Sequence, residues 1–433
     1  MSAQPPLSPM PSPLSSATLG KVRRVLVARL TPEDLNPFDR TPERDRLVRA
    51  TIASILEDPE LDLAPVPALV AAVEAAVCGL GPLQSLVDDR EVSDILVNAP
   101  DAIFAERAGR LEPSGVALAS DDELVEIAQR IAALAGRELS VSHPIVDARM
   151  PDGSRVNAVI PPVGGPYLAI RKFNRLRLDL APGGPRGRDW VTDGGMSAEM
   201  AAFLTRLVRA KANVLVAGET GAGKTTLLRS LTDLFDPAER VGVVEDTAEL
   251  ALENPDRFNL ETIHPHDLAT GDAESRLLDV GDLVANALRM RPDRLIVGEI
   301  RLPKEAFYTL QALHTGHDGS ATTIHASSAE DALFRLELLA RQSMRDLTVA
   351  DLRTYIARVF DLVVVLHRLR TGRRIVRQIA ALDGVDVDGY RLADIFRADL
   401  GAAAEEARFV RDPAWRPGAR LRARLEAEGE RWT

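Results

Sequence analysis

The sequence predicts an α/β domain with a mostly parallel sheet, preceded by an α+β N-terminal domain. In the second half of the chain, apolar runs of strand length alternate with helical ones, which is typical of a parallel sheet covered by helices. Glycine and proline concentrate over residues 174–196, and the length of 433 residues exceeds what one hydrophobic core usually holds. The expected strands of the second domain are 213–217, 241–244, 295–298, 321–324 and 362–366.

Three parts are expected before that breaker-rich stretch. Residues 1–20 are rich in Pro and Ser and predict a disordered tail, residues 21–78 have helical apolar spacing, and residues 79–173 mix strand and helix patterns. Residues 79–173 therefore form the α+β N-terminal domain. Inside it we expect strands within 92–111, a helix over 124–134, a hairpin with its turn at 151–154 and a last strand over 167–173.

The remaining boundaries follow from the breakers and from charge. Residues 174–196 are interpreted as the interdomain linker, and residues 197–396 as the second domain, which opens on a helix capped by Ser197. Residues 397–433 are charged and rich in arginine, and they predict a tail with one exposed helix.

Composition excludes several classes of protein. The 53 basic and 64 acidic residues give a net charge of −11, opposite in sign to the excess that nucleic-acid binding uses, so no stable nucleic-acid partner is expected. Cys78 is the one cysteine, which excludes an internal disulfide framework and indicates a reducing, cytoplasmic compartment. The sequence has no run of roughly eighteen apolar residues, so we expect membrane contact to be indirect.

A glycine-rich segment after the strand 213–217 matches the phosphate-loop pattern G-x-x-x-x-G-K-[ST]. Its backbone N–H groups and the following helix start suit the phosphates of ATP, with Lys224 bridging the β- and γ-phosphates and Thr225 holding Mg²⁺. A glycine-rich turn with an incidental lysine is the alternative. The predicted nucleotide-binding residues are Gly218, Glu219, Thr220, Gly221, Ala222, Gly223, Lys224, Thr225 and Thr226.

Carboxylates follow two other predicted strands, and strand ends of a parallel sheet face the ligand crevice. Many phosphate-loop NTPases have an aspartate at the end of a later strand, but here Gly298 takes that position ahead of Glu299. Glu245 and Glu249 are therefore candidates to act at Mg²⁺ or at the attacking water, Glu245 as a metal ligand, with a solvated helix cap as the alternative. Glu299 is the candidate that orients or deprotonates the water, and a salt bridge to Arg301 is its alternative.

Five of the seven histidines lie between residues 264 and 325. His317 and His325 stand at the two ends of the predicted strand 321–324, where they could sense the γ-phosphate, and a structural role is open for each. A metal site built from histidines is disfavoured because acids and thiols at ligand spacing are missing. The weaker functional candidates are His264, His266 and His314.

Four segments of the chain resemble the ATPases of type II and type IV secretion and of type IV pilus assembly, most closely the Tad/Flp pilus branch. They are the phosphate loop 218–226, the acidic box 244–250, the stretch 288–301 and the histidine box 315–326. In that family the Gly-Glu strand end is the rule, whereas Leu302 and Pro303 depart from the glycine that usually follows. Further matches lie at 80–83, 94–98, 151–156 and 170–173, so the resemblance spans roughly residues 79–396.

The resemblance implies a RecA-like phosphate-loop NTPase domain over 197–396. It implies a homo-hexameric ATPase motor at the cytoplasmic face of the inner membrane, which acts on an inner-membrane platform protein to power pilus assembly or secretion. It further implies that Arg149, Arg155 and Arg171 reach the nucleotide, with surface cations as the alternative. Two other functions stay open: a RecA-like nucleic-acid translocase, against which the net charge weighs, and an ATP-gated scaffold with little hydrolysis.

Overall fold

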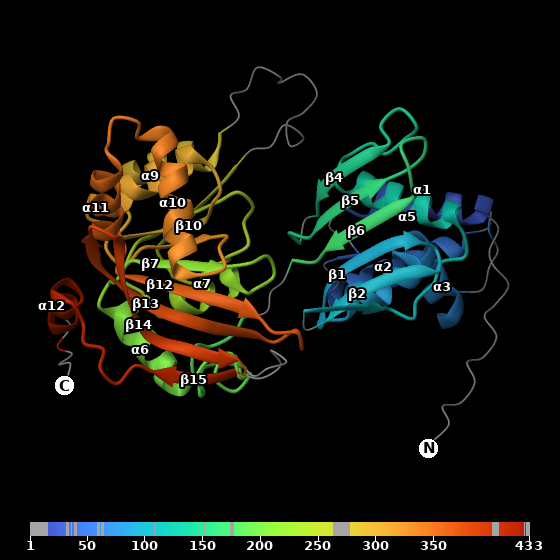
Figure 1. The fold of residues 1–433 in the computed structure, drawn as a ribbon. Helices are drawn as coiled ribbons and strands as arrows, with labels where there is room; N and C mark the ends of the chain where they lie inside the picture. The colour runs from blue at the N-terminus through green and yellow to red at the C-terminus, as the bar shows by residue number, and fades with distance from the viewer. Residues whose placement is uncertain are drawn as a thin grey trace. The chain divides into compact units, whose positions relative to one another are not determined.

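The chain forms two compact units, Met1–Asn174 and Arg175–Thr433, in the computed structural model (Figure 1). The structure describes residues 16–31, 34, 35, 37, 38, 41–58, 61, 65–107, 109–150, 152–173, 177–262, 278–400, 407–427 and 429. His264 and His266 lie outside these ranges.

The first unit begins with three helices that have a small core of their own. They are α1 (Ser16–Arg29), α2 (Pro42–Leu56) and α3 (Pro67–Val77), and they bury Leu26, Ile52 and Val73 among others. Helix α1 begins inside the segment that the sequence predicts as a tail through residue 20. That prediction is wrong at its end, because the last proline of the segment is Pro13 and nothing after it interrupts a helix. Residues 1–15 lie outside the described residues.

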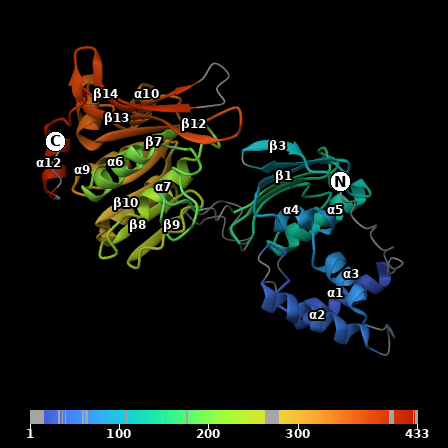
Figure 2. The ribbon, with the colours of Figure 1, turned by 90° about the horizontal axis from the view of Figure 1, so that it is seen from below.

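The rest of the first unit is an antiparallel six-stranded sheet in the order β3-β2-β1-β6-β5-β4. Its side chains alternate between buried and exposed, and helices α4 and α5 cover the buried face (Figure 2). The predicted strands, helix and hairpin all form. The bounds are α4 Gln84–Asp88, β1 Val92–Ala99, β2 Ala102–Arg107, β3 Arg110–Pro113, α5 Asp121–Leu134, β4 Ile145–Arg149, β5 Arg155–Val159 and β6 Tyr167–Arg171.

The second unit is built on a nine-stranded sheet in the order β15-β14-β13-β12-β7-β11-β10-β8-β9. From β12 to β9 all neighbours are parallel, and from β12 to β15 they are antiparallel. The five predicted strands form β7 (Val214–Gly218), β8 (Val241–Glu245), β10 (Arg294–Ile300), β11 (Ala321–Ile324) and β12 (Leu362–Arg368). The sequence did not predict β9 (Arg257–Glu261), β13 (Arg374–Asp386), β14 (Gly389–Leu400) or β15 (Ala407–Arg411).

Helices cover both faces of this sheet, as Figure 1 shows. Val214 and Val216 of β7 face one core with α6 (Ala198–Arg209), α7 (Lys224–Thr232) and α12 (Ala419–Ala427). Leu215 and Ala217 of the same strand face the other core. That side is covered by α8 (Val280–Ala287), α9 (Pro303–His314), α10 (Ala329–Ser343) and α11 (Val349–Val359). The result is the predicted α/β architecture of a RecA-like phosphate-loop domain. Among the helices of the described ranges, none combines the length and apolar composition that crossing a bilayer requires.

The expected linker 174–196 differs from the structure. Its described part belongs to the second unit, where Leu178, Leu180 and Trp190 are buried in the core. The indole Nε1 of Trp190 donates to Ser230 Oγ at 3.0 Å on α7. The glycines and prolines of this stretch form turns that fold the chain back onto the domain, so their density marks tight turns here rather than a free connection.

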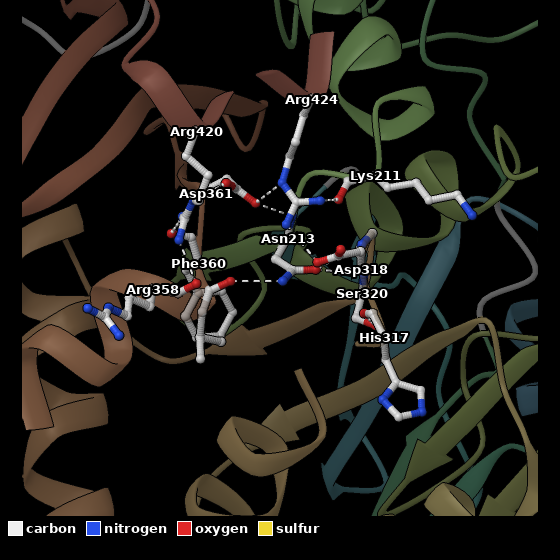
Figure 3. A network of polar contacts seen from close by, with 12 residues as sticks. Lys211, Asn213, His317, Asp318, Ser320, Arg358, Phe360, Asp361, Arg420 and Arg424 are labelled. Carbon is white, nitrogen blue, oxygen red and sulfur yellow. Dashed lines mark hydrogen bonds and ion pairs between the residues drawn. The ribbon is translucent and has the colours of Figure 1, made fainter. Parts of the chain in front are cut away.

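The predicted exposed tail 397–433 is also corrected by the structure. Its described residues continue β14, add β15 at the sheet edge and end in α12, whose Leu421 and Leu425 are buried in the core together with Trp415. Polar residues complete the attachment of α12 (Figure 3). Arg420 Nε and Arg424 Nε lie 2.7 and 3.3 Å from the two carboxylate oxygens of Asp361, whose side chain is 1% exposed.

Candidate nucleotide-binding site

Several predicted site residues lie at the ends of strands that meet the same edge of the second sheet. Strands β7, β8, β10 and β11 are parallel, with Ala217 opposite Ile324 and Val244 opposite Val297. Residues at the carboxyl ends of these strands therefore share one edge, where parallel α/β sheets place their ligands. Gly218 and Glu245 are the last residues of β7 and β8, Glu299 is the last residue but one of β10, and His325 directly follows β11.

The phosphate loop connects β7 to α7 in the predicted strand–loop–helix order. Gly221 and Gly223 have φ angles of +74° and +97°, which residues other than glycine rarely adopt. Lys224 begins α7, and its Nζ donates to the carbonyl oxygens of Gly218 at 2.9 Å and Glu219 at 3.3 Å. Burial lowers the pKa of the Lys224 ammonium, and the nearby Glu299 carboxylate opposes that shift. The loop is thus shaped and charged to receive phosphates.

The outer side of the loop packs against residues far away in the sequence. Arg374 Nε donates to the carbonyl oxygen of Gly221 at 3.0 Å. A Cβ added to Gly223 would lie 3.1 Å from Arg374 and 3.4 Å from the Trp190 ring. Arg374 at the start of β13 and Trp190 in the segment expected as a linker therefore pack against the phosphate loop.

Thr225 and Glu249 bring two oxygen donors together at the start of α7. Thr225 Oγ1 donates to Glu249 Oε2 at 3.4 Å. Hydroxyl and carboxylate oxygens are the donors that Mg²⁺ prefers, and beside phosphates this ion needs only one or two protein ligands. Within the parts of the chain that the structure describes, no cluster of three or more His, Cys, Asp or Glu is arranged to hold a metal alone. The donor set fits a Mg²⁺ ion that is shared with nucleotide phosphates.

Glu245, which the sequence suggests as a metal ligand, has backbone N–H groups as hydrogen-bond partners. Its side chain is buried, and Oε1 accepts the backbone N–H groups of Glu249 at 3.0 Å and Leu250 at 3.1 Å. Burial raises the pKa of Glu245 to about 7, although these two N–H groups oppose the shift. A Cβ on Gly298 would lie 3.1 Å from Glu245 Cγ, so the glycine at the usual aspartate position makes room for this side chain.

Glu299 is ion-paired, as its sequence-based alternative allowed. Arg301 donates to Glu299 Oε2 through Nε at 3.0 Å and Nη2 at 2.9 Å, and through Nη1 to Asp246 at 3.0 Å. The Glu299 side chain keeps 23% of its surface exposed. The departure at Leu302 has a simple basis: Leu302 is the extended N-cap of α9, and Glu305 accepts its N–H at 2.8 Å, so no glycine is required.

The two principal histidine candidates lie at opposite edges of the sheet. His325 follows β11 on the edge of the phosphate loop. His317 precedes β11, and its Nδ1 lies 2.9 Å from the carbonyl oxygen of Ala312 in the last turn of α9. Within one chain, β11 separates the two histidines, and only His325 lies on the edge of the phosphate loop; the sensing of the γ-phosphate stays a prediction for both.

The three arginines expected from the N-terminal domain form a row across its sheet. Arg149 pairs with Arg155 across the β4–β5 hairpin, and Arg155 pairs with Arg171 on β6. None of the three is buried, and Arg171 Nε donates to Asp94 Oδ1 at 3.0 Å on β1. The structure therefore gathers three guanidinium groups on one exposed face of the first unit.

Sequence reasoning missed several arginines around the second unit's site. Arg229 of α7 is buried, and its Nε donates to the carbonyl oxygen of Leu250 at 2.8 Å. Arg335 of α10 lies close enough to lower the pKa of Lys224. A single arginine on an amphipathic helix has no distinguishing pattern, so only the packing reveals these contacts.

Comparisons with known proteins identify the family of this chain. The model of the family described as Type II/IV secretion system protein matches residues 77–370. A Mycobacterium tuberculosis protein named for conjugal transfer is 33% identical over 343 residues, which cover 77% of this chain and 93% of that protein. Type IV secretion system protein PtlH of Bordetella pertussis is 36% identical over 313 residues, which cover 67% of this chain and 89% of PtlH.

Solved structures include the VirB11 ATPase of the Brucella suis type IV secretion system, which is 25% identical with a TM-score of 0.36. The match covers 80% of this chain and 96% of that one. The family match extends over more than half of the chain and includes the phosphate loop, the acidic box and the Gly-Glu strand end. The chain belongs to the Type II/IV secretion system protein family and is an ATPase.

Proposed function

We propose that this protein is the ATP-hydrolysing motor of a pilus-assembly or secretion apparatus of the Tad/Flp kind. It works as a homo-hexamer at the cytoplasmic face of the inner membrane and acts on a platform protein embedded there. The observation that carries the proposal is the shared sheet edge, where Lys224, the Thr225–Glu249 pair and Glu299 meet. The names of the relatives, which refer to conjugal transfer and type IV secretion, support the apparatus.

Each group at the edge has a role in this proposal. Lys224 and the N–H groups of the phosphate loop bind the phosphates, and Thr225 with Glu249 holds the metal. Mg²⁺ supplies neutralising charge to the phosphates when bound. Glu299 orients the attacking water after its carboxylate turns away from Arg301. Arg149, Arg155 and Arg171 bring permanent positive charge to the phosphoryl group from the first unit.

The direct test measures ATP hydrolysis by the purified full-length chain and its variants. Lys224→Ala is expected to abolish both nucleotide binding and turnover, and Glu299→Gln to keep ATP bound while turnover falls by about 100-fold or more. Lys304→Ala serves as the matched control. Lys304 forms ion pairs with Asp279, the N-cap residue of α8, and with Asp282 within that helix. Normal turnover in Glu299→Gln would contradict the role given to Glu299.

One observation favours the ATP-gated scaffold as a second candidate. The Glu299 carboxylate accepts two hydrogen bonds from Arg301, so it starts in an ion pair rather than free for water. Single-turnover hydrolysis separates the two functions: a motor converts bound ATP within one catalytic cycle, whereas a scaffold retains it unhydrolysed. Steep, salt-sensitive stimulation by nucleic acid would instead indicate a translocase.

The assembly proposed for the motor needs its own measurements. Light scattering of the purified protein with and without nucleotide reports whether six subunits assemble. Capture of membrane proteins on the Glu299→Gln variant, with the Lys224→Ala variant as the comparison, tests for the platform protein, since only the former is expected to hold ATP.

A further inference from the structure

The segment that carries Glu249 is fastened through two successive peptide groups. Residues 246–256 form neither helix nor strand, so their backbone groups need partners from elsewhere. Glu245 Oε1 accepts the N–H groups of Glu249 and Leu250 at 3.0 and 3.1 Å. Arg229 Nε donates to the Leu250 carbonyl oxygen at 2.8 Å, and its Nη2 donates to that of Glu249. Both sides of this short stretch are therefore held by buried charged side chains.

The two charged side chains are almost fully enclosed. Glu245 is 5% exposed and Arg229 is 4% exposed. Burial of charged groups is costly unless hydrogen bonds compensate, and here the compensating partners are peptide groups of the Glu249 segment. Gly298 confines Glu245 further, because a Cβ at residue 298 would already lie 3.1 Å from Glu245 Cγ. Neither side chain can leave the segment without exposing a buried polar group.

What this clamp holds in place is the Glu249 carboxylate. Oε2 of Glu249 accepts from Thr225 Oγ1 at 3.4 Å, at the donor set that fits Mg²⁺. We propose that Glu245 and Arg229 are positioning residues that set Glu249 beside Thr225, and that Glu245 is not itself a metal ligand. The inference rests on the proposed nucleotide function, and it assigns the acid at the metal to Glu249 through a backbone clamp.

Glutamine and alanine at residue 245 distinguish a positioning residue, for which the two variants differ, from a metal ligand, for which both lose binding. A glutamine carbonyl can accept both N–H groups but carries no charge, whereas alanine accepts neither. The measurement is the affinity for ADP, titrated with Mg²⁺ present and again with a chelator. Glu245→Ala is expected to reduce the Mg²⁺-dependent gain in affinity by about tenfold, which is the usual effect of removing a residue that orients a metal-binding group. Glu245→Gln is expected to lose only a small part of this gain. Equal losses in both variants would overturn the proposal.

A double variant shows whether Glu245 acts through Glu249. If it does, adding Glu245→Ala to Glu249→Ala weakens Mg²⁺-dependent binding no further, because the positioned group is already gone. An additive second loss would overturn the proposal. Glu239→Gln is the matched control, because it also removes a buried carboxylate. Glu239 pairs with Arg294 and lies just before β8, at the end of that strand opposite to Glu245.

Arg229 provides an independent arm on the other side of the clamp. Arg229→Met keeps the apolar stem and removes both donors, and we expect the same selective loss of the Mg²⁺-dependent gain, with thermal unfolding confirming that the variant folds. Unchanged Mg²⁺ dependence in folded Arg229→Met would contradict its positioning role. Failure of the proposed nucleotide site is distinguishable, because wild-type protein would then show no Mg²⁺-dependent gain at all.

Discussion

At the scale of single residues, the packing around Gly298 explains why a glycine stands where many phosphate-loop NTPases have an aspartate. Its neighbour across the strands is Glu245, whose Cγ would lie 3.1 Å from a Cβ at residue 298. The two hydrogen bonds that Glu245 accepts prevent it from giving way. Gly298 on β10 thus leaves the space that the long side chain of Glu245 on β8 fills.

Gly298→Ala is expected to destabilise the protein by about 1 to 3 kcal/mol, the usual cost of overfilling a packed site. It should also weaken Mg²⁺-dependent nucleotide binding, because the added methyl group displaces Glu245. Chemical unfolding and ADP titration measure the two effects. On a Glu245→Ala background the added cost should vanish, and Gly164→Ala, where the nearest contact is 3.7 Å, is the neutral control. A persistent cost on that background would contradict the contact.

The sequence predicts site residues well where the backbone itself carries the chemistry. The phosphate loop fixes its own geometry through glycines and a helix start, so its residues are found where the pattern places them. Side chains that depend on neighbours are harder to predict. The position of Glu245 over Gly298 and the pairing of Glu299 with Arg301 come from strand register and loop path, which spacing alone does not contain.

At the scale of elements, the attachment of α12 depends on a buried carboxylate. Asp361, which directly precedes β12, has a side chain only 1% exposed and receives Arg420 and Arg424 from α12 (Figure 3). The backbone N–H of Asn213 also donates to Asp361 Oδ2 at 2.8 Å. One carboxylate therefore joins α12 to the starts of β7 and β12.

Replacement of Arg420 and Arg424 by alanine together is expected to cost about 3 to 5 kcal/mol, because Asp361 keeps a buried charge without its two cations. The free energy of unfolding in urea measures the cost. Adding Asp361→Asn should recover part of the loss, since it removes the unpaired charge. Arg422→Ala on the same helix is the control, as Arg422 is exposed and its side chain donates to the Pro417 carbonyl oxygen rather than to Asp361. A large effect in the control would point to helix propensity instead.

Strands were predictable in the buried middle of the parallel part of the sheet, but not at its β9 edge or in the antiparallel part. Strands β7, β8, β10, β11 and β12 are short apolar runs, because both faces of that part of the sheet are covered. Strand β14 is only partly buried, with polar residues such as Arg391 and Asp394 interrupting its apolar ones. Such a pattern resembles an exposed tail in one dimension, and only pairing with β13 reveals it as sheet.

At the scale of the whole molecule, the boundary between the units lies at a different position in the chain from the end of the glycine-rich stretch. The linker expectation placed the second domain at residue 197, whereas the second unit begins at Arg175. Composition correctly indicated two folded parts, since length alone calls for more than one core. It could not distinguish turns packed on a domain from turns between domains, because both need the same residue types.

A pair of fragments tests this boundary. Residues 177–433 should fold and bind nucleotide, whereas residues 197–433 lack Leu178, Leu180 and Trp190 from the core and should melt at a markedly lower temperature or fail to fold. Loss of the Trp190 side chain alone is expected to cost about 3 to 5 kcal/mol. Thermal unfolding of both fragments gives the comparison. Identical melting temperatures would restore residues 174–196 as a linker.

The docking of α12 also determines the order in which the second unit can be completed during synthesis. Strand β7 ends at residue 218, yet the Lys211 carbonyl oxygen and Asp361 receive the Arg424 side chain only once residue 424 has been made. These contacts join residues more than 60 positions apart, and the first of them joins residues 213 positions apart. A nascent chain on the ribosome that ends before residue 420 therefore lacks both cations of Asp361, and the second unit is incomplete until α12 has emerged.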